Sequence, residues 1–243
     1  GVWESRGLPS RTDGEASPFV PPTESEGDSL WNRLSAAEVQ LDRDRHQAPG
    51  LVVRLLAASP LDRLAHLADP QFQTWGVGEL LVAACEEACE IDLAEAERLA
   101  HLALAFIATL RPPNHPEPLV EDLRARGWAA LGEVRRRQHS LEAAEEALHT
   151  AARALVRGTG DLLIEARLLE FEARLRLDGD RPLEAESLLR QASSRLRQAG
   201  EIGQWQRITA LRAAIVERVR AGRLKGREGH GSEGSLGPDA GNR

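Results

Sequence analysis

Arginine and glutamate are the residues of this chain whose identities and positions point most clearly to a chemical role, which is the pairing of guanidinium groups with carboxylates. All of the 31 basic residues except Lys225 are arginines. Glu133 lies four residues before Arg137, and Glu170 lies four residues before Arg174. A planar guanidinium binds a carboxylate through two parallel hydrogen bonds, so arginines in a groove suit an acidic peptide or a C-terminal carboxylate. The same spacing is also typical of ion pairs on the solvated face of a helix.

Catalytic motifs are absent from the sequence. It contains no Gly-rich phosphate-binding loop, no nucleophile elbow and no His-x-x-x-His pair. The 7 histidines are scattered singly along the chain. We therefore expect no catalytic residues, no cofactor and no enzymatic activity. An enzyme with an unfamiliar site is the competing hypothesis.

Cys85 and Cys89 are the two cysteines, and they lie four residues apart in a segment with helical periodicity. Protein metal sites usually need three or four ligands, and no further Cys or His cluster stands nearby in the sequence. The pair is therefore predicted to be two small buried residues in a reducing compartment, with no metal bound.

The composition favours helices that pack closely. Hydrophobic residues make up 42% of the chain, aromatic residues only 4%, and the apolar content is mostly Ala and Leu. The net charge of −7 disfavours nucleic-acid binding by this chain alone. No apolar run reaches the roughly 18–20 residues that cross a membrane. We expect a cytoplasmic protein, and the Arg-rich, Lys-poor composition is typical of a GC-rich bacterium.

Four segments follow from the pattern along the chain. Residues 1–29 are predicted to be a disordered acidic tail or linker, and residues 222–243 a disordered Gly-rich tail. Residues 30–71 are predicted to be an N-terminal helical segment that packs on the rest, with a break at Pro49-Gly50. Residues 72–221 are predicted to form a domain of helical repeats.

The helices of these segments follow from apolar periodicity and from their end signals. Ser59, Asp92, Ser140 and Asp161 are expected to cap the helices that they precede. Every connection is short apart from the Pro-rich loop at 111–118, so consecutive helices are expected to be antiparallel neighbours. The expected helices are Leu30–Arg45, Leu51–Ala58, 60–68, Phe72–Ile91, Leu93–Leu110, Leu119–Gln138, 141–156, Leu162–Leu177, 182–199 and Ile202–Arg220.

Small residues recur with one spacing on every second helix of the repeat segment. A small residue at the first position allows the preceding helix to approach closely, and the positions one and two turns later face the next pair of helices. The three sets, at relative positions 0, 4 and 7, are Ala96, Ala100 and Ala103; Ala144, Leu148 and Ala151; and Ala185, Leu189 and Ala192.

This pattern resembles the tetratricopeptide repeat across residues 72–221, most closely at 125–158. The signature positions there are held by Trp128, Leu131, Gly132, Ala144, Leu148 and Ala151. Arg135 stands where the family has an aromatic residue, and Val156 where it has Pro. Ala96 and Ala144 lie 48 residues apart and Ala144 and Ala185 lie 41 apart, against about 34 in the family.

The resemblance implies an all-α fold, an α-solenoid of stacked antiparallel helix hairpins with an irregular period. A simpler bundle of Ala- and Leu-rich helices is the alternative fold. In the family, the first helices of the pairs line a concave surface. Carried over, the partner-binding residues are Arg126, Glu133, Arg136, Arg137, Arg167, Glu170 and Arg174, with Ala129, Leu81, Cys85 and Cys89 beside them.

The function that follows from these expectations is that of a scaffold or adaptor. The concave face is predicted to bind a partner protein or an acidic peptide. One alternative is the sensor or regulatory portion of a bacterial transcription or signalling regulator whose effector domain lies outside this chain, since a sequence without Met is expected to be processed or part of a longer protein. A second alternative reads Arg135–Arg137 as a small nucleic-acid patch, although basic residues at a helix C-terminus also complement the helix dipole.

Overall fold

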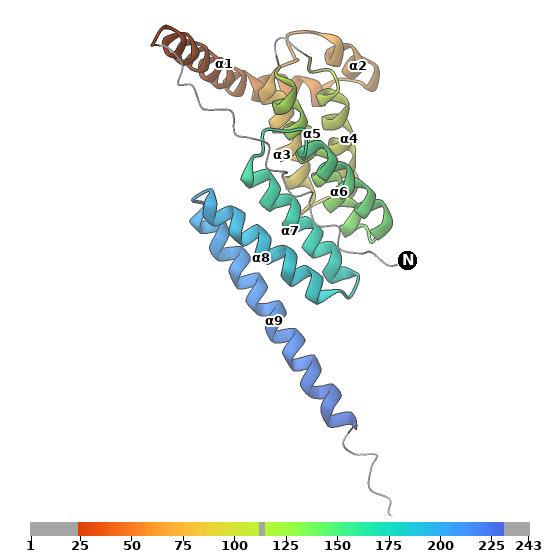
Figure 1. Ribbon diagram of the computed structural model, residues 1–243. Helices are drawn as coiled ribbons and strands as arrows, with labels where there is room; N and C mark the ends of the chain where they lie inside the picture. The colour runs from red at the N-terminus through yellow and green to blue at the C-terminus, as the bar shows by residue number, and fades with distance from the viewer. Residues whose placement is uncertain (1–23, 112–114, 231–243) are drawn as a thin grey trace, which may run out of the picture. The chain divides into compact units, whose positions relative to one another are not determined.

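The computed structural model describes residues 24–111 and 115–230 of the chain, and these residues are all-helical, with no strand among them (Figure 1). They divide between Arg43 and Asp44 into two units, and the first of these contains only the beginning of α1 among its described residues. The helices are α1 (Glu24–Ala57), α2 (Pro60–Ala68), α3 (Trp75–Ala88), α4 (Leu93–Ile107), α5 (Glu117–Arg137), α6 (Leu141–Leu155), α7 (Leu162–Asp178), α8 (Pro182–Gln198) and α9 (Ile202–His230).

The expected break at Pro49-Gly50 is wrong, because α1 continues through both residues to Ala57. Proline removes one backbone N–H from a helix, which weakens the helix without necessarily ending it. Ala48, Val52 and Leu55 are buried on one face across this point, so packing on both sides of Pro49 sustains the helix.

Both predicted tails are shorter than their composition suggested. The helix α1 begins at Glu24, so residues 24–29 are helical where a disordered linker was expected. The helix α9 extends to His230, so residues 222–230 are helical too. The remainder of each predicted tail, residues 1–23 and 231–243, lies outside the described residues.

The predicted helix starts are largely confirmed. The Ser59 hydroxyl accepts a hydrogen bond from the amide of Asp62 (3.3 Å) at the start of α2. The Asp92 carboxylate caps α4, and the Asp161 carboxylate accepts from the amide of Leu163 (2.7 Å) at the start of α7. Ser140 precedes α6 as expected, but its side chain makes no capping hydrogen bond.

The second half of α1 contacts the start of α3 closely at Asp44. The amide of Trp75 donates to the Asp44 carboxylate (3.3 Å), and a Cβ at Gly76 would lie 2.5 Å from the carbonyl oxygen of Asp44. Only glycine allows this approach without a backbone shift.

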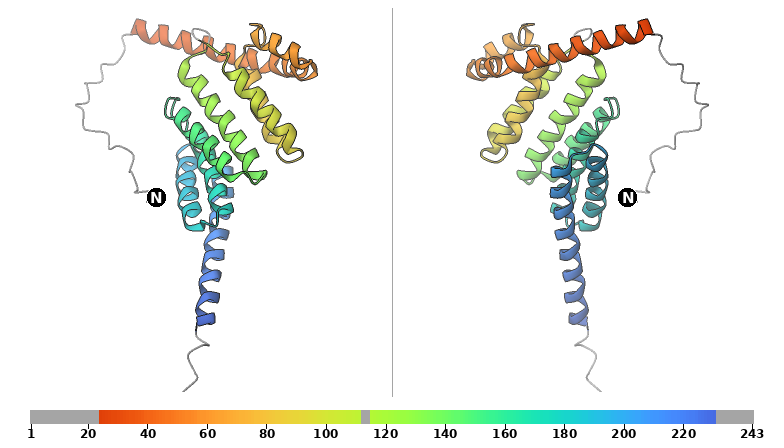
Figure 2. Two further views of the ribbon diagram at one scale, coloured as in Figure 1. Left: turned by 90° about the vertical axis from the view of Figure 1, so that its right-hand side faces the viewer. Right: turned by 90° about the vertical axis from the view of Figure 1, so that its left-hand side faces the viewer.

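From α3 onward, each helix packs against the next one in the chain, and α7, α8 and α9 lie side by side in both views of Figure 2. In addition, α5 contacts both α3 and α7. The stripes of small residues that the sequence predicted all lie in the core, because every member of the three sets is buried. Gly132 shows why small residues are needed between α5 and α6, since a Cβ there would lie 2.7 Å from a Leu148 methyl carbon.

Candidate functional site

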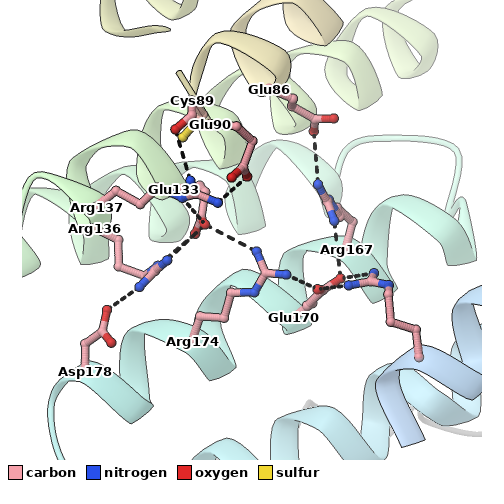
Figure 3. A network of polar contacts seen from close by, with 11 residues as sticks. Glu86, Cys89, Glu90, Glu133, Arg136, Arg137, Arg167, Glu170, Arg174 and Asp178 are labelled. Carbon is pink, nitrogen blue, oxygen red and sulfur yellow. Dashed lines mark hydrogen bonds and ion pairs between the residues drawn. The ribbon is translucent and has the colours of Figure 1, made fainter. Parts of the chain in front are cut away.

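The side chains predicted to bind a partner come together mainly on two helices, α5 and α7, that contact each other. Residues three or four positions apart share one face of a helix, and these faces of α5 and α7 meet each other and the end of α3. Figure 3 shows the resulting lattice of arginines and carboxylates. Its members are Glu86, Glu90, Glu133, Arg136, Arg137, Arg167, Glu170, Arg174, Asp178 and Arg207.

Glu133 is one centre of this lattice, with only 5% of its surface exposed. The Arg136 guanidinium donates to both of its carboxylate oxygens, from Nε to Oε2 (2.8 Å) and from Nη2 to Oε1 (3.0 Å). The Oε1 atom also accepts from Arg137 Nε (3.1 Å) and Arg174 Nη1 (3.2 Å). Three guanidinium groups therefore replace the water that this carboxylate loses on burial.

Glu170 is the second centre, with 2% of its surface exposed. Arg207 of α9 donates to both oxygens, from Nη1 to Oε1 (2.7 Å) and from Nη2 to Oε2 (2.8 Å). Arg174 also donates to Oε1, and Arg167 donates to Oε2 (3.4 Å). Arg174 thus bridges the two centres, because it is bonded to Glu133 and to Glu170 at once.

Three further carboxylates pair with the outer sides of these arginines. Arg137 pairs with Glu90, Arg136 pairs with Asp178, and Arg167 lies 3.8 Å from Glu86. Glu90 and Asp178 are exposed and Glu86 is partly exposed, unlike the two central glutamates. The lattice therefore has a buried set of carboxylates and an outer set in contact with water.

The charges shift the acidity of the groups that they surround. Burial by itself would raise the pKa of Glu133, but the hydrogen bonds and positive charge of Arg136, with Arg174 and Arg137, outweigh it and lower the pKa. Glu170 has the same balance, with burial opposed chiefly by the hydrogen bonds from Arg207, so its pKa is lowered too. The Glu133 carboxylate in turn raises the pKa of Arg136. Both central glutamates are therefore ionised at neutral pH.

The interpretation of Glu133–Arg137 and Glu170–Arg174 as pairs on a solvated helix face is wrong in one respect. Both ion pairs form, but their carboxylates are buried between helices. The sequence could not show this, because the partners from α9 and α3 lie at least 37 residues away along the chain.

Other predicted members of the surface lie around the lattice. Arg126 is outside it and lies 3.5 Å from Glu79 of α3. Ala129, Leu81, Cys85 and Cys89 are buried, so they contribute packing rather than an open surface. Arg135, from the basic run, donates to the carbonyl oxygen of Ala143 (3.2 Å). Arg207 was missed, because the sequence places it on the last helix with no acidic residue at helical spacing to mark it.

The interior of the lattice has little room for a ligand. A pocket of about 30 Å³ lies among α3, α5 and α7, which is space for a water molecule or two. Cys89 borders it, and its carbonyl oxygen accepts from Arg137 Nη1 (3.0 Å). Burial raises the pKa of the Cys85 thiol to about 12, and the pKa of Cys89 is raised as well, so both thiols are protonated at neutral pH.

No protein-family model, curated protein or solved structure matches this chain. Within the described residues, no three His, Cys, Asp or Glu side chains are grouped so as to hold a metal ion. None of the described helices combines the length and apolar character that crossing a membrane requires.

Proposed function

We propose that this chain is a non-enzymatic protein–protein interaction module, a stack of helix hairpins similar to tetratricopeptide proteins, that binds an acidic segment of a partner protein. The packing of α5 against both α3 and α7 supports such a stack, because in hairpin repeats the first helices of successive pairs line one surface. Here that surface carries the lattice of arginines and carboxylates.

The observation that carries this proposal is the division of the lattice into buried and outer carboxylates. Glu133 and Glu170 fix the arginines in place, so little side-chain entropy is lost when a ligand binds them. The outer pairs, such as Arg137 with Glu90, are exposed ion pairs of the kind worth about 0–1 kcal/mol each. Carboxylates of a partner can therefore replace Glu90, Asp178 and Glu86 at small cost, without disturbing the buried centres.

This exchange can be tested by removing the competing outer carboxylates. In the variant Glu90→Gln with Asp178→Asn, Arg137 and Arg136 lose an outer partner while Glu133 remains in place. The probe is a fluorescein-labelled, glutamate-rich peptide with a free C-terminal carboxylate, and binding is measured by fluorescence anisotropy at low salt. We expect the variant to bind several-fold more tightly than the natural chain, and added salt to weaken both.

The matched control is Glu142→Gln with Glu146→Gln, which changes the net charge equally on the exposed side of α6. An equal gain in this control would mean that the peptide senses only net charge. Absence of binding to all three proteins would overturn the assignment of this surface.

A further inference from the structure

A second and larger pocket lies on the other side of α7, between that helix and the end of α6. Its volume is about 510 Å³, within the range of about 300–1,000 Å³ that is usual for small-molecule sites. Glu165, Leu168 and Glu172 lie on the side of α7 opposite Glu170 and Arg174, as the helical spacing requires. The lining residues are Ala152, Leu155, Val156, Gly158, Thr159, Gly160, Asp161, Glu165, Leu168, Leu169 and Glu172.

The floor of this pocket is apolar. Leu168 and Leu155 belong to the core packing between α5, α6 and α7, so that part of the wall is held in place. Val156 at the end of α6 is 84% exposed, which leaves a large apolar side chain in water beside the pocket. A ligand with an apolar body would cover both the floor and Val156.

All charged residues that line this pocket are acidic. Two of the three already have partners: Asp161 caps α7, and Glu165 forms an ion pair with Arg195 of α8 (2.8 Å). Glu172 makes no hydrogen bond or ion pair within the described part of the chain. The nearest cation along α7, Arg176, attracts it but is paired with Glu145 (2.8 Å).

The environment of Glu172 is unfavourable for a charge. Burial raises its pKa, and the nearby Glu145 carboxylate adds to this, while Arg176 only partly opposes it. A carboxylate that lies beside an apolar pocket without a partner lowers the stability of the fold. Groups that lower stability in this way are concentrated at functional sites.

From this geometry we infer that the pocket binds a small organic cation with an apolar body, an alkyl or arylalkyl amine, whose ammonium group pairs with Glu172. A neutral ligand would leave Glu172 without a partner, and an anion would meet three carboxylates. This site is separate from the arginine lattice, so its occupation does not depend on the proposed binding of an acidic partner.

The test uses three probes that share one apolar body: 4-phenylbutylamine, 4-phenylbutanol and 4-phenylbutanoate. Amide chemical shifts of Gly158, Thr159 and Gly160 report on binding, because these residues line the pocket. In titrations of the full chain, we expect the amine to shift them saturably and to bind at least about tenfold more tightly than the alcohol. The butanoate is expected to cause no saturable shift.

The variant Glu172→Gln removes the charge and retains the shape of the side chain, and we expect it to abolish the preference for the amine over the alcohol. Its matched control, Glu146→Gln on the exposed side of α6, should keep that preference. Equal binding of the three probes, or an unchanged preference in Glu172→Gln, would overturn the inference. Neither result would alter the binding of an acidic peptide to the arginine lattice, so the two proposals fail separately.

Discussion

Glu170 and Glu172 lie two residues apart on α7, and their surroundings have opposite effects on the same functional group. Glu170 faces α5 and α9, where three arginines lower its pKa. Glu172 faces the apolar pocket, where burial without a bonded partner raises its pKa. One carboxylate therefore stabilises the fold when it is charged, and the other destabilises it.

Replacing Glu170 by Gln should lower the free energy of unfolding by about 1.5–3 kcal/mol near neutral pH, because three partly exposed guanidinium groups lose their charged hydrogen-bond acceptor. Since the pKa of Glu170 is lowered on folding, its contribution is present above the ordinary value of 4.5 and is lost as pH falls through the folded value. Urea unfolding at a series of pH values checks this, and the variant should lose less stability in acid than the natural chain. If the unfolding free energies of the two proteins had the same pH dependence, Glu170 would not be the ionised, stabilising carboxylate that the structure indicates.

Replacing Glu172 by Gln should have the opposite effect. A carboxyl whose pKa is raised on folding contributes stability below its ordinary value of 4.5, and this contribution is lost as pH rises through the folded value. The variant should therefore be more stable near neutral pH, by about 0.5–1 kcal/mol, and the difference should vanish in acid. Thermal unfolding of both proteins, followed by circular dichroism at neutral pH and in acid, measures this difference in stability. A destabilised variant at neutral pH would show that Glu172 has a stabilising partner.

At the scale of helices, Gly132 determines how closely α5 and α6 approach. A methyl group at this position would lie 2.7 Å from a Leu148 carbon, so Leu148 must shift within a packed core. We expect Gly132→Ala to lower the free energy of unfolding by about 1–2 kcal/mol, even though alanine favours helix. The control is Gly50→Ala in α1, where a Cβ meets no atom within 4 Å. Denaturant unfolding should show that Gly50→Ala is at least as stable as the natural chain. A similar loss of stability in Gly132→Ala and Gly50→Ala would argue against the packing explanation.

The helix pattern could be predicted because its signals are local. Asp161 and Ser59 mark helix starts by their own side chains, and the stripe Ala144–Leu148–Ala151 marks a buried face by its spacing. The break at Pro49 was predicted incorrectly because its outcome depends on tertiary packing. Buried Ala48 and Val52 on either side of Pro49 stabilise the helix beyond the cost of one missing hydrogen bond.

At the scale of the whole molecule, the candidate site depends on contacts between helices far apart in the sequence. The sequence predicted that Arg136 and Arg174 belong to the candidate site, but it could not show that Glu133 is buried or that Arg207 of α9 reaches Glu170. The net charge of the chain did not indicate this cluster of arginines, because carboxylates from α3, α5 and α7 balance their charge. The pocket beside Glu172 was not predicted at all, because it is lined by the α6–α7 loop as well as by both helices.

Arg174 connects the two buried centres, so their contributions to stability should not be independent. Glu133 belongs to α5 and Glu170 to α7, and Arg174 donates to both. When either glutamate is replaced by Gln, Arg174 retains one carboxylate, but in the double variant it has neither. We expect the double variant Glu133→Gln with Glu170→Gln to lose more stability than the sum of the single losses, by about 0.5–2 kcal/mol.

Chemical denaturation of the natural chain, both single variants and the double variant measures this coupling. The same cycle carried out in an Arg174→Gln background is the control, because removing the shared guanidinium should remove most of the coupling. Additivity within a few tenths of a kcal/mol in the natural background would mean that the two centres stabilise their helices separately. Coupling that disappears with Arg174 would instead establish that one side chain links the packing of α5 to that of α7 and, through Glu170 and Arg207, to α9.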